Sequence, residues 1–156
     1  TWLHENRDVR FLPVHLVNSP ERIARNRDMV SINGAMAVDL SGQVVADTIG
    51  GKQFSGVGGH EDFVSGPGLS ASGRSLVCLP STSTVDGRLV SRIVPELPAG
   101  SVISTPRHQV DVIITEFGVA ELRSRTVRER TAALIAIAHP DHRDGLRREA
   151  KQMGYL

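Results

Sequence analysis

The residues that most invite a chemical interpretation are the glycines of residues 55–63, SGVGGHEDF. Gly56, Gly58 and Gly59 expose successive backbone N–H groups, and such groups can hold an anion or stabilise a developing oxyanion. The alternative is a flexible turn before a helix that Asp62 caps. The spacing alone leaves both interpretations open.

Two common phosphate-binding motifs are excluded in the same region. The pair Gly51-Lys52 lacks the Walker spacing, because Ala46 stands where that motif needs Gly and Gln53 where it needs Ser or Thr. The glycines of residues 56–59 fail the dinucleotide fingerprint, since the third one comes too early.

Histidines, carboxylates and the single cysteine offer fewer candidates. The six histidines lack ligand spacing, so we expect no metal site. His60 adjoins the glycines and is retained as a candidate contact. Glu116 follows an apolar strand, where a parallel sheet would place a site residue, although a carboxylate that contacts backbone amides fits equally well. Cys78 lies in an apolar run and is predicted to be a small core residue.

Composition narrows the class of protein. A chain of 156 residues is long enough for one domain with one core, and we treat residues 1–156 as a single domain. A net charge of +1 and an aromatic content of 4% argue against nucleic acid or an anionic membrane as the main partner. One cysteine excludes an intrachain disulfide and permits a reducing compartment, so we expect a cytoplasmic protein. The chain opens at Thr1-Trp2 without an initiator Met, which we interpret as a fragment of a longer protein.

The elements that must position these residues begin with strands. Residues 10–17 alternate and predict a strand, and Ser19-Pro20 predicts the start of a short helix. Residues 29–47 predict a hairpin-like pair around Ser41-Gly42. Further strands are predicted at residues 76–80, 89–94, 101–104 and 110–115.

The last forty residues follow a helical pattern. We expect a short helical turn at residues 119–122, and a helix that Thr126 and Glu129 cap in a capping box. His139-Pro140 ends that helix, and Asp141 is predicted to cap a final helix over residues 143–153. Strands followed by helices indicate an α/β domain with an open mixed sheet and flanking helices.

Several segments together resemble the C-terminal domain of the acetyl-CoA hydrolase/transferase family, which includes 4-hydroxybutyrate and succinyl-CoA:acetate CoA-transferases. The resemblance runs in the family's order from about residue 18 to about residue 146. It rests on residues 31–35 (SINGA), 39–44 (DLSGQV), 52–63 (KQFSGVGGHEDF), 91–95 (SRIVP), 111–122 (DVIITEFGVAEL) and 137–140 (IAHP).

The resemblance implies a CoA-transferase-like half with an open α/β sheet, with the active site between two related halves. It implies a reaction in which a glutamate attacks an acyl-CoA, passes through a mixed anhydride and becomes a glutamyl-CoA thioester. That glutamate lies upstream of the segment that matches Thr1, and neither Glu61 nor Glu116 matches its motif. We therefore expect no catalytic side chain here, no cofactor, and coenzyme A as a substrate.

The same resemblance implies which residues contact the substrate. Gly59 corresponds to a CoA-contacting position, and its backbone N–H is a candidate oxyanion donor. The full set of expected substrate contacts is Ser55, Gly56, Gly58, Gly59, His60 and Asn33. Two features depart from the family: His60 stands where members mostly carry Gln, and residues 81–84 lack the Lys that some members place near a CoA phosphate.

Two functions follow from this sequence. The first is the C-terminal half of a CoA-transferase or acetyl-CoA hydrolase, whose partners are an acyl-CoA, a small carboxylic acid and the upstream half, in an expected homo-oligomer. The second is a stand-alone ligand-binding or regulatory module that has the fold without the chemistry.

Overall fold

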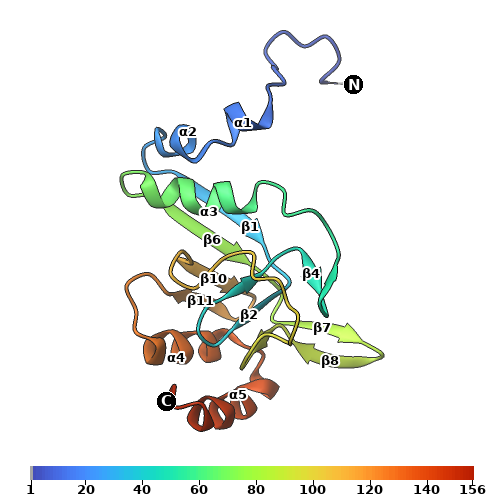
Figure 1. The fold of residues 1–156 in the computed structure, drawn as a ribbon, viewed down its shortest axis with the longest axis vertical. Coiled ribbons are helices and arrows are strands. Elements are labelled where there is room, and N and C mark those ends of the chain that lie inside the picture. The colour runs from blue at the N-terminus through green and yellow to red at the C-terminus, as the bar shows by residue number, and fades with distance from the viewer. Residues whose placement is uncertain (1) are drawn as a thin grey trace.

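The main sheet of the computed structural model, which describes residues 2–156, has four strands (Figure 1). In spatial order these are β1 (Val30–Gly34), β6 (Arg74–Cys78), β10 (Val112–Thr115) and β11 (Gly118–Glu121). The first three are parallel, and β11 returns antiparallel to β10. The predicted open mixed sheet of an α/β domain is therefore confirmed.

Smaller sheets lie beyond the ends of the parallel strands. They are formed by β2 (Ala37–Asp39), β3 (Val44–Val45) and β9 (Ile93–Val94); by β4 (Thr48–Ile49) and β5 (Lys52–Gln53); and by β7 (Thr82–Val85) and β8 (Arg88–Ser91). The predicted hairpin around Ser41-Gly42 is confirmed as β2–β3. Gly42 supplies the positive φ of 95° that the turn requires, and Asp39 Oδ1 accepts hydrogen bonds from two backbone N–H groups of the turn.

Within residues 2–156, five helices flank the sheets, and they cover the main sheet unevenly. They are α1 (Val14–Val17), α2 (Pro20–Ala24), α3 (His60–Leu69), α4 (Val127–Ile137) and α5 (Pro140–Gln152). Helix α3 packs against β1 and β6 and carries α2 on its outer side, whereas α4 packs against β11 and α5. The capping box of Thr126 and Glu129 is confirmed at the start of α4.

The connection from β1 through α3 to β6 fixes where the ends of these elements lie. Because β1 and β6 are parallel, α3 must run back along the sheet, so α3 begins at the edge where the parallel strands end. We call this the carboxyl edge. By the same topology, the chain from β2 to residue 59 lies on the carboxyl-edge side, as does the turn that follows β10.

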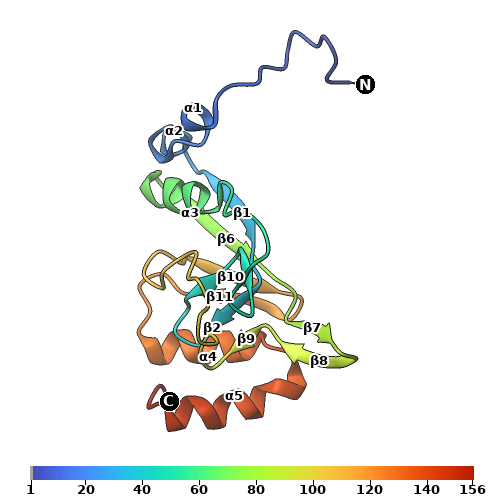
Figure 2. The same cartoon turned by 45° about the vertical axis from the view of Figure 1, so that its right-hand side comes forward.

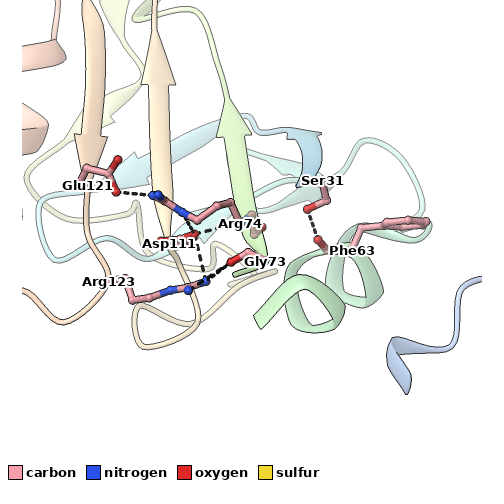
Figure 3. A network of polar contacts seen from close by, with 8 residues as sticks. Ser31, Phe63, Gly73, Arg74, Asp111, Glu121 and Arg123 are labelled. Atoms are coloured by element: carbon pink, nitrogen blue, oxygen red, sulfur yellow. Dashed lines mark hydrogen bonds and ion pairs between the residues drawn. The ribbon is translucent and has the colours of Figure 1, made fainter. Parts of the chain in front are cut away.

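The opposite, amino edge carries a compact ion cluster (Figure 3). Asp111 is buried, and its Oδ2 lies 2.9 Å from Arg74 Nε and 3.1 Å from an Arg123 terminal nitrogen. The same oxygen accepts from Ser75 N at 3.2 Å, and Arg74 also pairs with Glu121. This hydrogen bonding with Asp111 raises the pKa of Arg74. The cluster joins the starts of β6 and β10 to the end of β11.

Two predicted strands are wrong. Residues 10–17 contain the single turn α1, because Pro13 sets a helix start and no strand lies beside the segment. The segment before α1 runs away from the body of the molecule (Figures 1 and 2), and Phe11 is 82% exposed. Residues 101–104 are irregular and contact β3 at their end, where Ser104 N donates to the Val44 carbonyl at 2.9 Å beside the bridge between Val44 and Thr105.

Other local predictions also need correction. The expected helical turn at residues 119–122 is mostly strand β11, which pairs along all of β10. The last helix starts at Pro140, and its N-cap is His139, whose ring accepts from the Asp141 N–H; Asp141 is therefore not the cap. Strand β7 was not predicted. Cys78 is half-buried on β6, so the prediction that Cys78 is a core residue is wrong.

Candidate functional site

The glycine segment lies at the carboxyl edge, between the small hairpin β4–β5 and the start of α3. Its residues 54–58 are exposed, Gly59 is half-buried, and His60 is buried as the first residue of α3. Gly59 is the N-cap of α3 and offers no side chain, so Asp62 does not cap this helix. The bend between hairpin and helix therefore presents backbone to solvent.

In the described structure, the ends of this segment use their backbone N–H groups, and its middle does not. Phe54 N and Ser55 N both donate to the Asp47 carbonyl, at 2.9 and 3.2 Å, and His60 N reaches the Val57 carbonyl at 3.3 Å. Within residues 2–156, no acceptor takes a hydrogen bond from the four N–H groups of residues 56–59. Such a run of free donors is suited to an anion or an oxyanion.

Asp47 holds the incoming end of the segment. Its carboxylate accepts from Ser104 Oγ at 2.7 Å and from Gln53 Nε2 at 3.1 Å, while its carbonyl receives the two N–H groups at the start of the loop. The hydrogen bond from Ser104, with a smaller contribution from Gln53, lowers the pKa of Asp47. The ionised carboxylate therefore fixes the loop to the segment that precedes β10.

The outgoing end is held by His60 through a short hydrogen-bonded chain. His60 Nε2 lies 2.9 Å from Thr105 Oγ1, and the Thr105 hydroxyl lies 3.3 Å from Glu61 Oε2. Because an ionised Glu61 only accepts, Thr105 donates to it, and the ring must donate from Nε2 to Thr105. Burial lowers the pKa of His60, which favours the neutral ring, and the hydrogen bond to Thr105 then selects the form protonated at Nε2.

Two glycines of the loop are required for different reasons. Gly58 has a φ of +60°, which disfavours any side chain even though the space around it is open. Gly59 has an ordinary φ, but a Cβ there would lie 2.6 Å from Asn18 Nδ2 and 3.4 Å from the Phe63 ring. A methyl group at Gly59 would therefore push the Asn18 amide aside and lie against the Phe63 ring, next to the Gly59 N–H.

Asn33, the sixth predicted contact, lies one residue from the carboxyl end of β1. It shares a face of β1 with Ser31, whose hydroxyl donates to the Phe63 carbonyl in α3 (Figure 3). Asn33 is half-buried, and its Nδ2 is fully buried without an acceptor in the described part of the chain. Asn33 is thus on the sheet face that α3 covers, with an unused donor near the carboxyl edge.

Glu116 is bound to its neighbour across the same edge. Its carboxylate accepts from Ser81 N at 2.9 Å and from Ser81 Oγ at 2.6 Å. These bonds lower the pKa of Glu116 and keep it ionised. The interpretation of Glu116 as a carboxylate that contacts a backbone amide fits this geometry.

The anchors of the loop could not be found in the sequence. Asp47, Ser104 and Thr105 carry no motif, and Thr105 is 45 residues from His60. Only the glycines and their neighbour His60 gave a local signal.

Residues 2–156 contain no group of three or more His, Cys, Asp or Glu side chains arranged to hold a metal ion. Among the same residues, no helix has both the length and the apolar character needed to cross a bilayer.

Comparisons with known proteins agree on one family. The profile of the acetyl-CoA hydrolase/transferase C-terminal domain matches residues 1–150. The 4-hydroxybutyrate coenzyme A transferase of Clostridium kluyveri is 46% identical over 97% of this chain, and an acetyl-CoA hydrolase of Candida albicans is 32% identical over 83%. The chain spans 35% and 24% of these two relatives, respectively.

Solved structures agree with the sequence relatives. The crystal structure of RipA from Yersinia pestis matches with a TM-score of 0.89 and 38% identity, over 99% of this chain and 34% of that one. A 4-hydroxybutyrate CoA-transferase from Porphyromonas gingivalis gives a TM-score of 0.77 at 38% identity, over 97% of this chain and 34% of that one. The chain therefore belongs to the acetyl-CoA hydrolase/transferase family and corresponds to its C-terminal domain.

Proposed function

We propose that this chain is the CoA-binding part of an enzyme that transfers CoA between an acyl-CoA and a carboxylic acid, or hydrolyses acetyl-CoA. The observation that carries the proposal is the run of four unused N–H groups at residues 56–59, at the carboxyl edge of a parallel sheet. Ligands of open α/β sheets bind outside this edge. The names of the sequence relatives supply the acyl-CoA and the acid.

In this proposal the chemistry begins on a glutamate of an upstream part of a longer protein. Its carboxylate attacks the thioester carbonyl to give a tetrahedral oxyanion, which collapses with loss of CoA as a thiolate and leaves a mixed anhydride. The thiolate then attacks the glutamyl carbonyl, which releases the acid and forms a glutamyl-CoA thioester. A second acid reverses these steps, whereas water hydrolyses the thioester.

The residues of this chain act on the oxyanion and on the position of CoA. The N–H of Gly59 is the proposed oxyanion donor, and Ser55, Gly56 and Gly58 line the approach of the thioester. The first turn of α3 contains Glu61 and Asp62, which offset the positive end of the helix. Charge stabilisation therefore depends on the loop N–H groups more than on the helix dipole.

Exposed apolar side chains support the proposed upstream part. Val30 and Ile32 share one face of β1 and are 52% and 71% exposed, on a sheet of a kind that is normally covered on both faces. We assign this face to contact with the upstream part. The homo-oligomer is a separate proposal, and sedimentation of the longer protein tests it.

The chain itself provides the first test. Without the upstream glutamate, it should release no thiol from acetyl-CoA, while a CoA titration should shift the amide NMR signals of residues 56–59. For a substitution of Gly59, Gly68→Ala is the matched control, because Gly68 is exposed, lies in α3 and has open space around it. Sustained thiol release that Glu61→Gln or Glu116→Gln abolishes would place the nucleophile on this chain and contradict the proposal.

A further inference from the structure

The main sheet buries one of its two faces and leaves the other largely exposed. Along β1 and β6, buried side chains alternate with exposed or half-buried ones, and the register places the buried members of neighbouring strands side by side. On the buried face, Ser31 donates to the Phe63 carbonyl of α3, and Thr115 of β10 donates to the Ile137 carbonyl of α4. Helices α3 and α4 therefore lie on the same face of the sheet.

The opposite face is apolar across all four strands. We call it the open face, and it consists of Val30, Ile32, Leu76, Cys78, Ile114 and Val119. Val30, Ile32 and Val119 are 52%, 71% and 56% exposed, and the other three are half-buried. A contiguous apolar patch on a parallel sheet is typical of a surface that another element covers.

The charges at the border of the open face already have partners. Arg74 of β6 and Glu121 of β11 form an ion pair (Figure 3), and this pair spans β10 because β10 lies between the two strands. Glu121 is directly opposite Val112, which is buried. The open face itself is uncharged, so it fits an apolar surface of a protein partner and not a charged ligand.

The topology explains why this chain leaves the face open. The parallel strands follow the order β1, β6, β10 across the sheet, so both crossovers step in the same direction. Right-handed crossovers that step in one direction run over one face, and α3 and the segment from β7 to β9 form the two crossovers here. Of the other helices, α2 packs on α3 and α5 packs on α4. A helix on the open face must therefore come from a different part of a polypeptide.

The dimensions of the open face match one helix. Strands β1 and β6 have five residues each, which at the usual rise span about 16 Å, the length of about 11 residues of α-helix. Four strands about 4.8 Å apart give a width of about 14 Å, slightly more than the diameter of a helix with its side chains. This chain spans 35% of its transferase relative and matches a domain named C-terminal, so that relative has a large upstream part.

We propose that the open face binds an amphipathic α-helix from the upstream part of the longer protein, with the apolar side of the helix across β1, β6 and β10. Such a helix gives the sheet the cover on both faces that parallel sheets normally have. Its apolar side chains recur every three to four residues. The proposal rests on the longer protein of the proposed function, but not on its chemistry.

The single cysteine provides the probe, because Cys78 is half-buried within the open face. Labelling of Cys78 with N-ethylmaleimide, measured by mass spectrometry of its peptide, should be at least about tenfold slower in the longer protein than in this chain. Equal labelling rates in the two proteins would overturn the proposal. Protection in the isolated chain that increases with its concentration would assign the face to a second copy and also overturn it.

Matched substitutions separate docking from general stability. In the longer protein, Ile32→Lys should restore Cys78 labelling to within about threefold of the rate in the isolated chain, because the helix would bury an unpaired charge. In the isolated chain, Ile32→Lys should leave the urea midpoint unchanged, since Ile32 is 71% exposed. Leu69→Lys, at a 69% exposed position of α3, should change neither measurement in either protein. Equal effects of the two substitutions on labelling would contradict docking at this face. If the longer Ile32→Lys protein does not fold, the labelling of the two unmodified proteins decides.

Photo-cross-linking tests whether the partner is a helix. With p-benzoylphenylalanine in place of Ile32 or Val119, we expect cross-links to upstream residues that are three, four or seven positions apart. Cross-links to alternate residues would indicate a strand and overturn the proposal. Neither the labelling nor the cross-linking needs CoA, so a CoA titration that leaves residues 56–59 unmoved would count against the proposed function alone.

Discussion

The ion cluster at the amino edge and the glycine segment at the carboxyl edge use their polar groups differently. At the amino edge, the buried Asp111 pairs with Arg74 and Arg123 and accepts a backbone N–H as well. At the carboxyl edge, the N–H groups of residues 56–59 have no partner, although the segment is held firmly at both ends. Polar groups that are paired hold strands together, and donors that remain free on a fixed loop are available to a ligand.

The largest effect should come from a substitution that crowds the free N–H groups at the carboxyl edge. In the longer enzyme that we propose, Gly59→Ala should lower turnover on the order of a hundredfold, the usual loss for one oxyanion donor. The cause is the new methyl group, which lies between the Asn18 amide and the Phe63 ring and crowds the place where the thioester oxygen would meet the Gly59 N–H. Steady-state rates with acetyl-CoA measure the effect, with Gly68→Ala as the matched control.

A double variant tests the stated cause of that loss. Asn18→Ala removes the atom that the new methyl group meets most closely, so Asn18→Ala/Gly59→Ala should recover part of the turnover. Gly59→Ala with turnover within threefold of the unmodified enzyme would remove this N–H from the mechanism.

A substitution at the amino edge should change the free energy of unfolding and not the binding of CoA. Asp111→Asn removes the charge that two guanidiniums share and should lower the free energy of unfolding by about 2 kcal/mol. The loss is moderate because Arg74 and Arg123 are 39% and 49% exposed and regain water. Urea unfolding measures it, and Glu121→Gln, at an exposed partner of Arg74, is the control with a loss below about 1 kcal/mol.

That prediction has a clear failure. If Asp111→Asn unfolds like the unmodified chain but shifts the CoA titration of residues 56–59, the division of roles between the two edges is wrong.

A smaller effect is expected from loosening the loop. Thr105→Val keeps the shape of the side chain but leaves His60 Nε2 and Glu61 without their shared hydroxyl. We expect a loss of about 1–2 kcal/mol in unfolding free energy and faster amide exchange at residues 56–60. Thr105→Ser retains the hydroxyl and should restore both; equal exchange in the Val and Ser variants would contradict the anchoring role.

The smallest effect concerns pH. Burial lowers the pKa of His60 in the folded chain below the value of 6.5 that it has in the unfolded chain. As the pH falls, the unfolded chain therefore binds the proton first. His60 therefore costs stability as pH falls from about 7.5 through 6.5 toward the folded pKa, by at most about 1.4 kcal/mol per pH unit. The lowered pKa values of Asp47 and Glu116 act at lower pH, where protonation removes their stabilising bonds.

His60→Gln isolates that slope. Unfolding free energies between pH 5.5 and 7.5 should vary less with pH in this variant than in the unmodified chain. An identical slope in both proteins would assign the pH dependence to other groups.

Local sequence signals predicted the elements whose hydrogen bonds close within a few residues. The Ser41-Gly42 turn and the Thr126–Glu129 capping box are of this kind. In the described part of the chain, residues 10–17 have strand-like composition but no neighbouring strand, and residues 101–104 meet β3 only at Ser104; composition cannot supply a partner. Strand β11 was missed because its pairing with β10 depends on the tight turn at Glu116-Phe117, after which Gly118 takes a φ of +140°.

The candidate site, like the fold, could be predicted only where its signal is local. Gly56, Gly58 and Gly59 stand out in the sequence because several glycines in a short segment are a local feature. The bonds that fix them, from Asp47 to Ser104 and from His60 to Thr105, join residues 57 and 45 positions apart. Contacts of that separation depend on the completed fold, so the sequence indicates where the donors are and not what holds them.

The parallel pairing of the main sheet also bears on how fast this chain folds. Strand β1 pairs with β6, which begins at Arg74, and β6 pairs with β10, which begins at Val112. The chain must therefore close long loops, at a cost in entropy, before either pair of strands forms its hydrogen bonds. Chains dominated by such distant pairings fold in milliseconds to seconds, more slowly than helical bundles of similar size. During synthesis, the apolar residues of β1 and β6 emerge well before β10, which makes the nascent chain a candidate for chaperone binding until the last strand is added.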